Sequence, residues 1–333
     1  MLQLDNQTPF KAAIAVLPDR SGVDTLYVVV KATLMLRPNL SLAPEQAPPA
    51  MADEYYDDPA TSSLRVASEM HIGKAGTDVL LVGHARPPGN RQVERMKVSL
   101  SVAERRKELL VSGDRTWSDG KPTNPMPFEA MPLVWERAFG GVHRLDDRVL
   151  AEERNPVGCG FAGERSANEI EQQPVPNLED PAAPLEKLGQ LSTPACFAPV
   201  APAWLPRRAY AGTYDANWQR TRAPYLPADF DPRFLQSAAA EFAFDRYLQG
   251  GEPVTISGVS PDAPVSFTLP PSPLSLEVLV AGASQRPPAN LETLLIEPDE
   301  NRACLTWRAA LPCDRQVLKV EKIIVAMAGR PRA

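Results

Sequence analysis

Proline limits what this chain can fold into more than any other residue. The chain has 36 prolines among its 333 residues, about twice the average usage of about 5%. Because proline fixes its own φ and has no N–H to donate, it interrupts helices and central strands alike. The sequence therefore predicts many short elements joined by ordered loops.

Composition and charge exclude several classes of protein. Hydrophobic residues make up 44% of the chain, enough for a sizeable core in one large or two coupled domains. The formal net charge is −6, whereas a dedicated nucleic-acid binder needs clustered lysine and arginine. No stretch has the roughly 18 apolar residues of a membrane-spanning helix, and the first residues lack the pattern of a secretory signal. We expect a cytoplasmic protein that binds neither nucleic acid nor membranes, with its four cysteines reduced.

Short runs rich in valine, isoleucine and tyrosine indicate strands. Residues 10–17 and 25–36 flank a turn-rich linker and predict a long hairpin. The acidic residues 38–63 read as a loop. Further strands are predicted at 64–71, 78–86, 94–102, 108–112, 253–257, 265–269, 274–281, 293–297, 303–309 and 317–327. The expected fold is mainly β, with sandwich or open-barrel-like sheets and one or two short helices.

Three sections follow from this pattern. Residues 1–123 read as an N-terminal β domain, and residues 231–333 as a short helix followed by a C-terminal β section. Regular patterning fades in residues 124–230, but a structureless loop of that length is improbable in a compact domain. We expect this middle section to be a loop-rich platform of aromatic residues, glycine and proline packed on the sheets. The three sections are expected as separate units or as one continuous fold.

One helix has clear boundary signals. Asp231 can cap its N-terminus, Pro232 suits the first helical position, and Gly250 can end it. The apolar face expected between these ends comprises Phe234, Leu235, Ala238, Ala239 and Phe242.

The stretch 132–161 has the most strongly constrained backbone. Residues 133–139 predict a strand that places Trp135, Arg137 and Phe139 on one face. Arg137 is then either paired with a carboxylate inside the fold or exposed at a surface that binds something. Glycines and an Asn-Pro turn follow, and they fix the path of the chain. The residues assigned a structural role are Gly140, Gly141, Asn155, Pro156, Gly158, Gly160, Asn177 and Asp231.

No pattern in the sequence predicts catalysis. Residues 158–163 match G-x-G-x-x-G, but the charged residues before them cannot form the buried strand of a dinucleotide site. The three histidines lack the spacing of a metal-binding helix, and no nucleophile elbow occurs. We expect no enzyme, no metal site and no cofactor.

Aromatic residues alternate with arginine in residues 203–225. This segment has four arginines and one aspartate in an acidic chain, and tryptophan, tyrosine and arginine dominate the binding energy of protein interfaces. The alternative is a segment at the edge of the core whose arginines pair with the acidic loop 45–58. The predicted partner-binding residues are Trp135, Arg137, Phe139, Trp204, Arg207, Tyr214, Trp218 and Arg220.

Several ordered motifs resemble a known family. They are LVWERAFGG (133–141), NPVGCGF (155–161), PNLE (176–179), AGTYDANW (211–218), PADFDPRF (227–234) and LQGGE (248–252). Together with NQTPF (6–10) they resemble the family catalogued as domain of unknown function 2169, found in bacterial type VI secretion clusters. Two positions depart from the family pattern: alanine lies between Phe197 and Pro199 where glycine is expected, and Cys159 occupies a glycine-rich position.

The resemblance implies an adaptor or chaperone without catalytic residues. Such a protein would bind a type VI effector or PAAR-domain protein, aid its loading, and contact the spike protein. Two alternatives remain open. One is a glycan-binding or glycan-active β protein that uses Trp204, Tyr214 and Trp218 as platforms, with Glu136 or Asp215 as the acid. The other is a structural component of the secretion particle.

Overall fold

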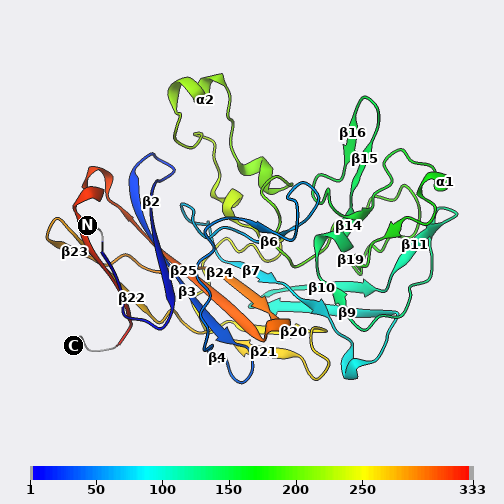
Figure 1. Ribbon diagram of the computed structural model, residues 1–333, viewed down its shortest axis with the longest axis horizontal. Coiled ribbons are helices and arrows are strands. Elements are labelled where there is room, and N and C mark those ends of the chain that lie inside the picture. Colours follow the sequence, from blue (N-terminus) through cyan, green and yellow to red (C-terminus); the bar gives the residue numbers. More distant parts are fainter. Residues whose placement is uncertain (1–2, 330–333) are drawn as a thin grey trace.

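A computed structural model describes residues 3–329 and shows a mainly β protein built from open sheets (Figure 1). The predicted fold class is confirmed. The largest sheet has six strands, ordered β2-β3-β25-β24-β7, with β4 beside β3. Their bounds are β2 Lys11–Pro18, β3 Asp24–Met35, β4 Ser41–Leu42, β7 Asp78–Leu81, β24 Asn290–Glu297 and β25 Arg302–Pro312.

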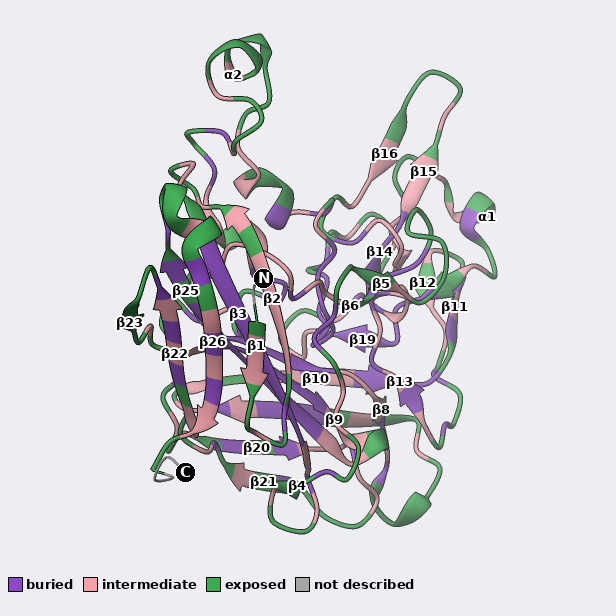
Figure 2. Ribbon diagram, turned by 60° about the vertical axis from the view of Figure 1, so that its left-hand side comes forward, coloured by how far each residue is buried: buried purple, intermediate pink, exposed green. Residues whose placement is uncertain are grey.

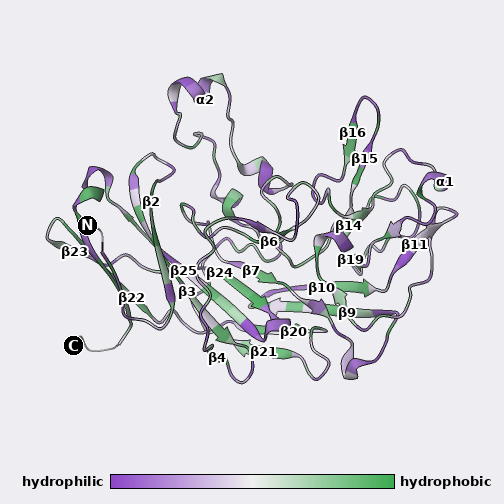
Figure 3. Cartoon of the chain, in the orientation of Figure 1, coloured by the Kyte–Doolittle hydropathy of each residue, from purple (hydrophilic) through white to green (hydrophobic). Residues whose placement is uncertain are grey.

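The two faces of this sheet differ in chemistry. Leu26, Val28 and Val30 of β3 belong to the main hydrophobic core, and β24 is mainly hydrophobic in Figure 3. On the opposite face of β3, Lys31 lies beside Thr306 of β25 in the register of the two strands. Side chains alternate across a strand, so one face of the sheet is apolar and the other carries charge.

A second sheet shares the apolar core. Val98 and Leu100 belong to the same hydrophobic cluster as the apolar face of β3, and Figure 1 shows the strands of the two sheets running in different directions. This sheet has the order β19-β10-β9-β20-β21. Its strands are β9 Arg95–Val102, β10 Arg105–Ser112, β19 Leu178–Glu179, β20 Pro253–Ser257 and β21 Val265–Thr268.

A third sheet brings the two ends of the chain together. Its order is β1-β26-β22-β23, and β1 runs parallel to β26. The strands are β1 Gln3–Asn6, β22 Leu274–Val280, β23 Ala283–Gln285 and β26 Val320–Met327. All three sheets combine strands from residues 1–123 and 231–333, so these two sections do not form separate sheets.

The middle section consists of short elements and loops. The paired strands here, with their partners from residues 1–123, are β8 His84–Ala85, β11 Arg115–Ser118, β12 Lys121–Pro122, β13 Met131–Pro132, β14 Phe139–Gly140, β15 Val142–Arg144, β16 Val149–Ala151, β17 Cys159–Gly160 and β18 Pro174–Val175. Strands β5 Glu54–Tyr55 and β6 Leu64–Val66 pair with each other within residues 1–123. The middle section also has the helices α1 Ala167–Ile170 and α2 Ala216–Thr221 and the 3₁₀ helices Trp135–Arg137 and Arg207–Tyr210. The other 3₁₀ helices are Pro88–Asn90, Pro232–Leu235, Pro298–Glu300 and Asp314–Lys319.

Strand predictions hold where apolar runs are bounded by turn residues. The β2–β3 hairpin is confirmed, with antiparallel pairing from Lys11–Lys31 to Pro18–Asp24. Strand β20 has the predicted bounds 253–257. The predicted strand 64–71 is shorter, because only Leu64–Val66 pairs, with β5.

Two predicted elements are wrong. The strand expected at 133–139 is a 3₁₀ turn, Trp135–Arg137, followed by the two-residue strand β14. The helix expected after Asp231 ends after one turn, at Leu235. Phe242 and Phe244 beyond it are buried, so their apolar spacing serves an irregular segment instead of a helix.

Candidate partner-binding surface

Trp135 and Trp204 lie together inside the fold. Their rings meet edge to face with centroids 6.2 Å apart, and both are 4% exposed. The Trp135 Nε1–H donates to the carbonyls of Ala198 and Pro199 at 3.0 and 2.9 Å. This pair therefore joins two loops of the middle section and is not available to a partner.

Phe139 and Arg207 are buried as well. Phe139 belongs to a small second core with Trp117 and Ile170. The Arg207 guanidinium donates to the carbonyls of Val200 and Phe234 at 2.5 and 3.0 Å. Four of the eight predicted partner-binding residues, Trp135, Phe139, Trp204 and Arg207, are therefore buried and not available to a partner.

Arg137 lies at the edge of the middle section. Its guanidinium donates to the Asp114 carboxylate at 2.7 Å and to the Asn177 side-chain oxygen at 3.1 Å. Asn177 in turn donates to the carbonyl of Ser112. Arg137 thus ties the middle section to the end of β10. It is paired with a carboxylate, but this ion pair lies at the surface and not inside the fold.

The glycine-rich stretch brings two backbone segments into close contact around Asn155. The fully buried Asn155 amide donates to the carbonyls of Trp135 and Phe139 at 2.8 and 3.0 Å. A Cβ at Gly140 would lie 2.0 Å from the Asn155 carbonyl, and one at Gly158 would lie 2.6 Å from the carbonyl of Ala138. Only glycine allows this approach.

The chain turns at four other residues to which the sequence assigns a structural role: Gly141, Pro156, Gly160 and Asp231. Gly141 and Gly160 have φ of 118° and 87°, where glycine is favoured. Pro156 follows Asn155 into the turn that leads to β17. The Asp231 carboxylate accepts from the Arg233 amide at 2.9 Å, capping the short 3₁₀ helix.

Tyr214, Trp218 and Arg220 lie on a projecting segment, residues 212–226, that we name the arm (Figure 1). Its helix α2 begins where the Asp215 carboxylate accepts from the Trp218 amide at 2.8 Å. The Tyr214 and Trp218 rings meet edge to face at 4.8 Å. The Trp218 Nε1–H donates to the Tyr225 carbonyl at 2.8 Å. The aromatic side chains therefore have a defined arrangement.

The arm is attached to the turn of the β2–β3 hairpin. The Arg222 guanidinium donates to the Arg20 carbonyl at 2.6 Å. A Cβ at Gly22 would lie 3.5 Å from the Tyr225 ring, so this ring packs against the turn. These contacts fix the base of the arm and leave α2, largely hydrophilic in Figure 3, projecting from the sheets.

The arm presents aromatic surface and an unpaired cation. Tyr214 is 54% exposed and Tyr225 is 41% exposed. Within residues 3–329, the Arg220 guanidinium has no hydrogen bond or ion pair. By contrast, Asp229 accepts from the amide and the hydroxyl of Thr213, and these bonds lower the pKa of its carboxyl group. We name Tyr214, Trp218, Arg220 and Tyr225 the arm surface.

The sequence analysis missed exposed apolar residues beside the arm. Val16 of β2 is 41% exposed, and Leu318 in the 3₁₀ helix after β25 is 93% exposed. The Cys313 amide donates to the Asp24 carbonyl, which holds the start of that 3₁₀ helix near the β2–β3 turn. Only their exposure identifies these residues, because isolated valine and leucine carry no signal in the sequence.

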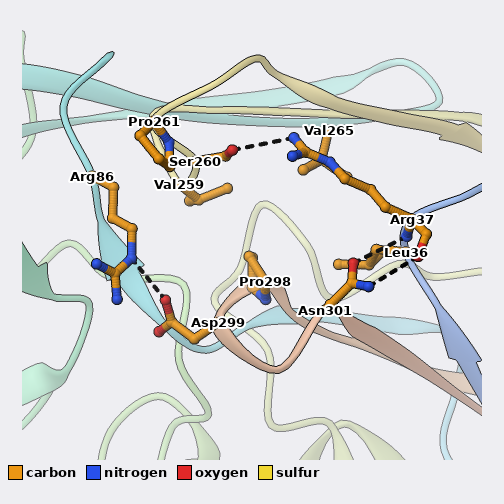
Figure 4. A pocket seen from close by; sticks show the side chains of 10 residues that line it. All are labelled: Leu36, Arg37, Arg86, Val259, Ser260, Pro261, Val265, Pro298, Asp299 and Asn301. Atoms are coloured by element: carbon orange, nitrogen blue, oxygen red, sulfur yellow. Dashed lines mark hydrogen bonds and ion pairs between the residues drawn. The ribbon is translucent and has the colours of Figure 1, made fainter. Parts of the chain in front are cut away.

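The pocket shown in Figure 4 holds charged groups that are already paired. In Figure 4, Arg86 donates to Asp299 at 3.1 Å and Arg37 to Ser260 at 3.2 Å. This open pocket has a volume of about 420 Å³. Its lining residues are Leu36, Arg37, Arg86, Val259, Ser260, Pro261, Val265, Pro298, Asp299 and Asn301.

No cluster suited to metal binding or thiol catalysis occurs in the described residues. No group of three or more His, Cys, Asp or Glu side chains there could hold a metal ion. Burial raises the pKa of the Cys159 and Cys196 thiols to about 12, so neither is a nucleophilic thiolate near neutral pH. Between residues 3 and 329, no helix is long and apolar enough to cross a membrane.

Comparison with known proteins identifies the family of the chain. Neither the curated proteins nor the solved structures gave a match. A family model described as "Uncharacterized protein conserved in bacteria (DUF2169)" matches residues 21–308. The match covers most of the sequence, and the chain belongs to this family.

Proposed function

We propose that this protein is a cytoplasmic, non-catalytic adaptor that binds another protein. The arm surface is the observation that carries the proposal. It combines three aromatic rings with an arginine that has no partner in the described chain, and these residue types dominate protein interfaces. A fixed base at the β2–β3 turn lowers the entropy lost when the arm binds.

The type VI secretion role within this proposal rests on the sequence resemblance. The adaptor would bind a PAAR-linked effector, stabilise it, and aid its loading onto the spike. The paired charges of the pocket in Figure 4 support a binding role over a catalytic one.

Co-expression with a PAAR-linked effector from the same genome tests the proposal. We expect the effector to co-purify with this protein and to become more soluble. Trp218→Ala and Arg220→Ala should each weaken the complex, and Arg220→Ala should leave the free energy of unfolding within about 0.5 kcal/mol, as for a typical surface change. The controls are Met126→Ala and Arg91→Ala, which alter exposed residues outside the arm.

The results would separate the alternatives. Equal binding by the arm variants and their controls would reject the arm surface, and no complex with any effector would reject the adaptor role. Stoichiometric co-purification with assembled spikes, without free effector, would indicate a structural component of the particle.

Most of the residues expected to form a glycan site are not available for one in the structure. Trp204 is buried. The Glu136 carboxylate accepts from the amide and the hydroxyl of Ser63, and Asp215 caps α2. Only the Tyr214–Trp218 pair remains as an exposed platform, so a glycan array with Trp218→Ala as the control tests what is left.

A further inference from the structure

Strand β2 forms a long, open edge of the six-stranded sheet. It pairs with β3 along eight residues, and within the described residues it forms a backbone ladder with no other strand. Figure 2 shows β2 as mostly half-buried beside the buried β3 and β25. The six residues from 12 to 17 contain neither a charge nor a proline, although edge strands usually carry one of these to prevent pairing.

The other large-sheet edges are short or covered. Strand β7 receives backbone bonds from the segment around Phe242, because the Val79 amide donates to the Phe242 carbonyl at 3.0 Å. Strand β21 has four residues and lies between Pro264 and Pro270. Strand β23 has three residues. Within the part of the chain that the structure describes, β2 is therefore the exception.

The hairpin register shows which backbone groups point outward. The Asp19 amide donates to the Val23 carbonyl, and bonded pairs alternate along an antiparallel ladder. Lys11, Ala13, Ala15 and Leu17 therefore turn their amides toward β3. The amides of Ala12, Ile14 and Val16 point away from the sheet, and no hydrogen bond from them to another described segment occurs.

The side chains of β2 cover the adjacent part of the main hydrophobic core only incompletely. Ala12 and Ile14 pack against the main hydrophobic core but are only half-buried, and Val16 is 41% exposed. An added strand with apolar side chains on one face would cover these three residues and extend the core.

Charge at the two ends of β2 selects the kind of partner. Lys11 lies at one end, and Arg20, in the turn that leads to β3, lies at the other. Within residues 3–329, neither cation forms a hydrogen bond or ion pair with a carboxylate. The pKa of Asp231 is lowered mainly by its hydrogen bond from Arg233, and the charge of Arg20 contributes to this shift. The Asp19 carboxylate is held by the amides of Ser21 and Val23, and Asp24 is on β3, behind the edge.

A second copy of this chain fits the edge poorly. Antiparallel pairing of β2 with its copy would bring Lys11 of one chain close to Arg20 of the other, and like charges across a pair are destabilising. A segment from a different protein with acidic ends has the complementary charge.

We propose that β2 accepts an extended segment of a partner protein as an additional strand, with an apolar centre and acidic ends. This inference deepens the proposed adaptor function, since it names the partner element that would bind beside the arm. In strand addition, backbone hydrogen bonds supply affinity and alternate side chains supply specificity.

A peptide with alternating valine and threonine, flanked by aspartates and labelled with fluorescein, serves as the probe. We expect the full chain to bind it and the Ala12, Ile14 and Val16 amides to become protected from hydrogen exchange. Val16→Pro removes an outward amide without removing a bond to β3, so it should weaken binding by about tenfold or more. Val16→Thr keeps the amide and should bind like the unchanged chain.

Peptide variants test the same idea without altering the protein. Backbone N-methylation at alternate residues should abolish binding, and lysine flanks should weaken it. Equal binding of the N-methylated peptide, unchanged affinity with Val16→Pro, or no protection of the three amides would overturn strand addition. A dimer in sedimentation equilibrium that Val16→Pro dissociates would identify a second copy as the occupant and overturn the proposed partner.

The adaptor function and the β2 edge can fail separately. An effector complex that forms equally well with Val16→Pro but is lost with Trp218→Ala would reject the edge and keep the adaptor. Binding of the peptide at β2 without any effector complex would support the edge and reject the adaptor.

Discussion

Tryptophan has two different roles in this protein. The Trp135 ring is buried against Trp204, and its N–H satisfies two loop carbonyls. Trp218 packs its ring against Tyr214 on the arm and directs its N–H to the arm's own backbone. The first therefore contributes to the stability of the fold, and the second shapes an exposed surface.

Replacement of Trp135 tests the first role. Trp135→Ala removes a large buried ring and leaves two carbonyls without a donor, so the free energy of unfolding should fall by about 3–5 kcal/mol. Chemical denaturation followed by circular dichroism measures the change. A loss no larger than that of Arg220→Ala would contradict the buried role of Trp135.

The sequence could not distinguish these roles. One segment, residues 203–225, alternates aromatic residues with arginine. Its residues Trp204 and Arg207 are buried, whereas Tyr214 and Trp218 lie on the arm. Arg207 is buried because backbone carbonyls accept its N–H groups, and such carbonyl partners leave no trace in a sequence. The glycines around Asn155 were easier to assign, because close backbone approach requires that residue type.

The central sheet carries buried ion pairs on its polar face. The Lys31 ammonium donates to Glu69 at 2.9 Å, and the Arg308 guanidinium donates to Glu292 at 2.6 Å. All four side chains are almost fully buried. Removing one partner of such a pair leaves an uncompensated charge.

Lys31→Met tests the energy of this layer. The substitution leaves Glu69 facing the sheet without its cation, and the free energy of unfolding should fall by about 3–5 kcal/mol. Arg148→Ala breaks the exposed pair with Glu164 and should cost at most about 1 kcal/mol. Urea denaturation of both variants gives the comparison, and similar losses would contradict a special role for the buried layer.

His71 makes the stability of the same layer depend on pH. Burial, and then the nearby cations Arg308, Lys74 and Arg207, hold the pKa of His71 well below its ordinary value. The unfolded chain gains a proton below about pH 6.5 that the folded chain excludes, so stability falls by about 1.4 kcal/mol per further pH unit.

Denaturation at about pH 7.5 and about pH 5.5 measures this effect. The unchanged protein should lose more stability between these conditions than His71→Gln, which cannot take up the proton. An equal loss in both proteins would assign the pH dependence to other groups.

At the level of elements, strands were more predictable than helices. The apolar run of β3 and the proline-bounded β20 have one plausible backbone conformation each. The apolar residues Phe234, Ala238 and Phe242 have helical spacing, but the backbone is already extended at Gln236, where the predicted helix should continue. The helix does not form because tertiary packing of Phe242 overrides the local pattern. Helix α2 was missed because it has only six residues and no buried face to produce an apolar period.

At the scale of the whole molecule, the sheets join distant parts of the sequence. Strand β3 lies between β2 and β25, and β9 lies between β10 and β20. The sequence shows which runs form strands, but long-range pairing follows from packing that local patterns do not encode. The expected N-terminal section therefore contains strands whose neighbours come from the last third of the chain.

A fragment of residues 1–123 should not fold alone. Without β25, the apolar face of β3 loses a neighbouring strand and its backbone loses a ladder of hydrogen bonds. We expect no cooperative thermal transition for this fragment, whereas a mixture with residues 124–333 should regain one. Differential scanning calorimetry measures both, and a cooperative transition of the isolated fragment would contradict the shared-sheet arrangement.

The parallel pairing of β1 with β26 has a consequence for synthesis on the ribosome. Strand β1, Gln3–Asn6, finds its partner only when Val320–Met327 leaves the exit tunnel. Contacts between residues so far apart in sequence form slowly, and the apolar runs of β2 and β3 stay exposed until their partners are made. The sheet that joins β1 to β26 can therefore be completed only after nearly all of residues 3–327 have been synthesised.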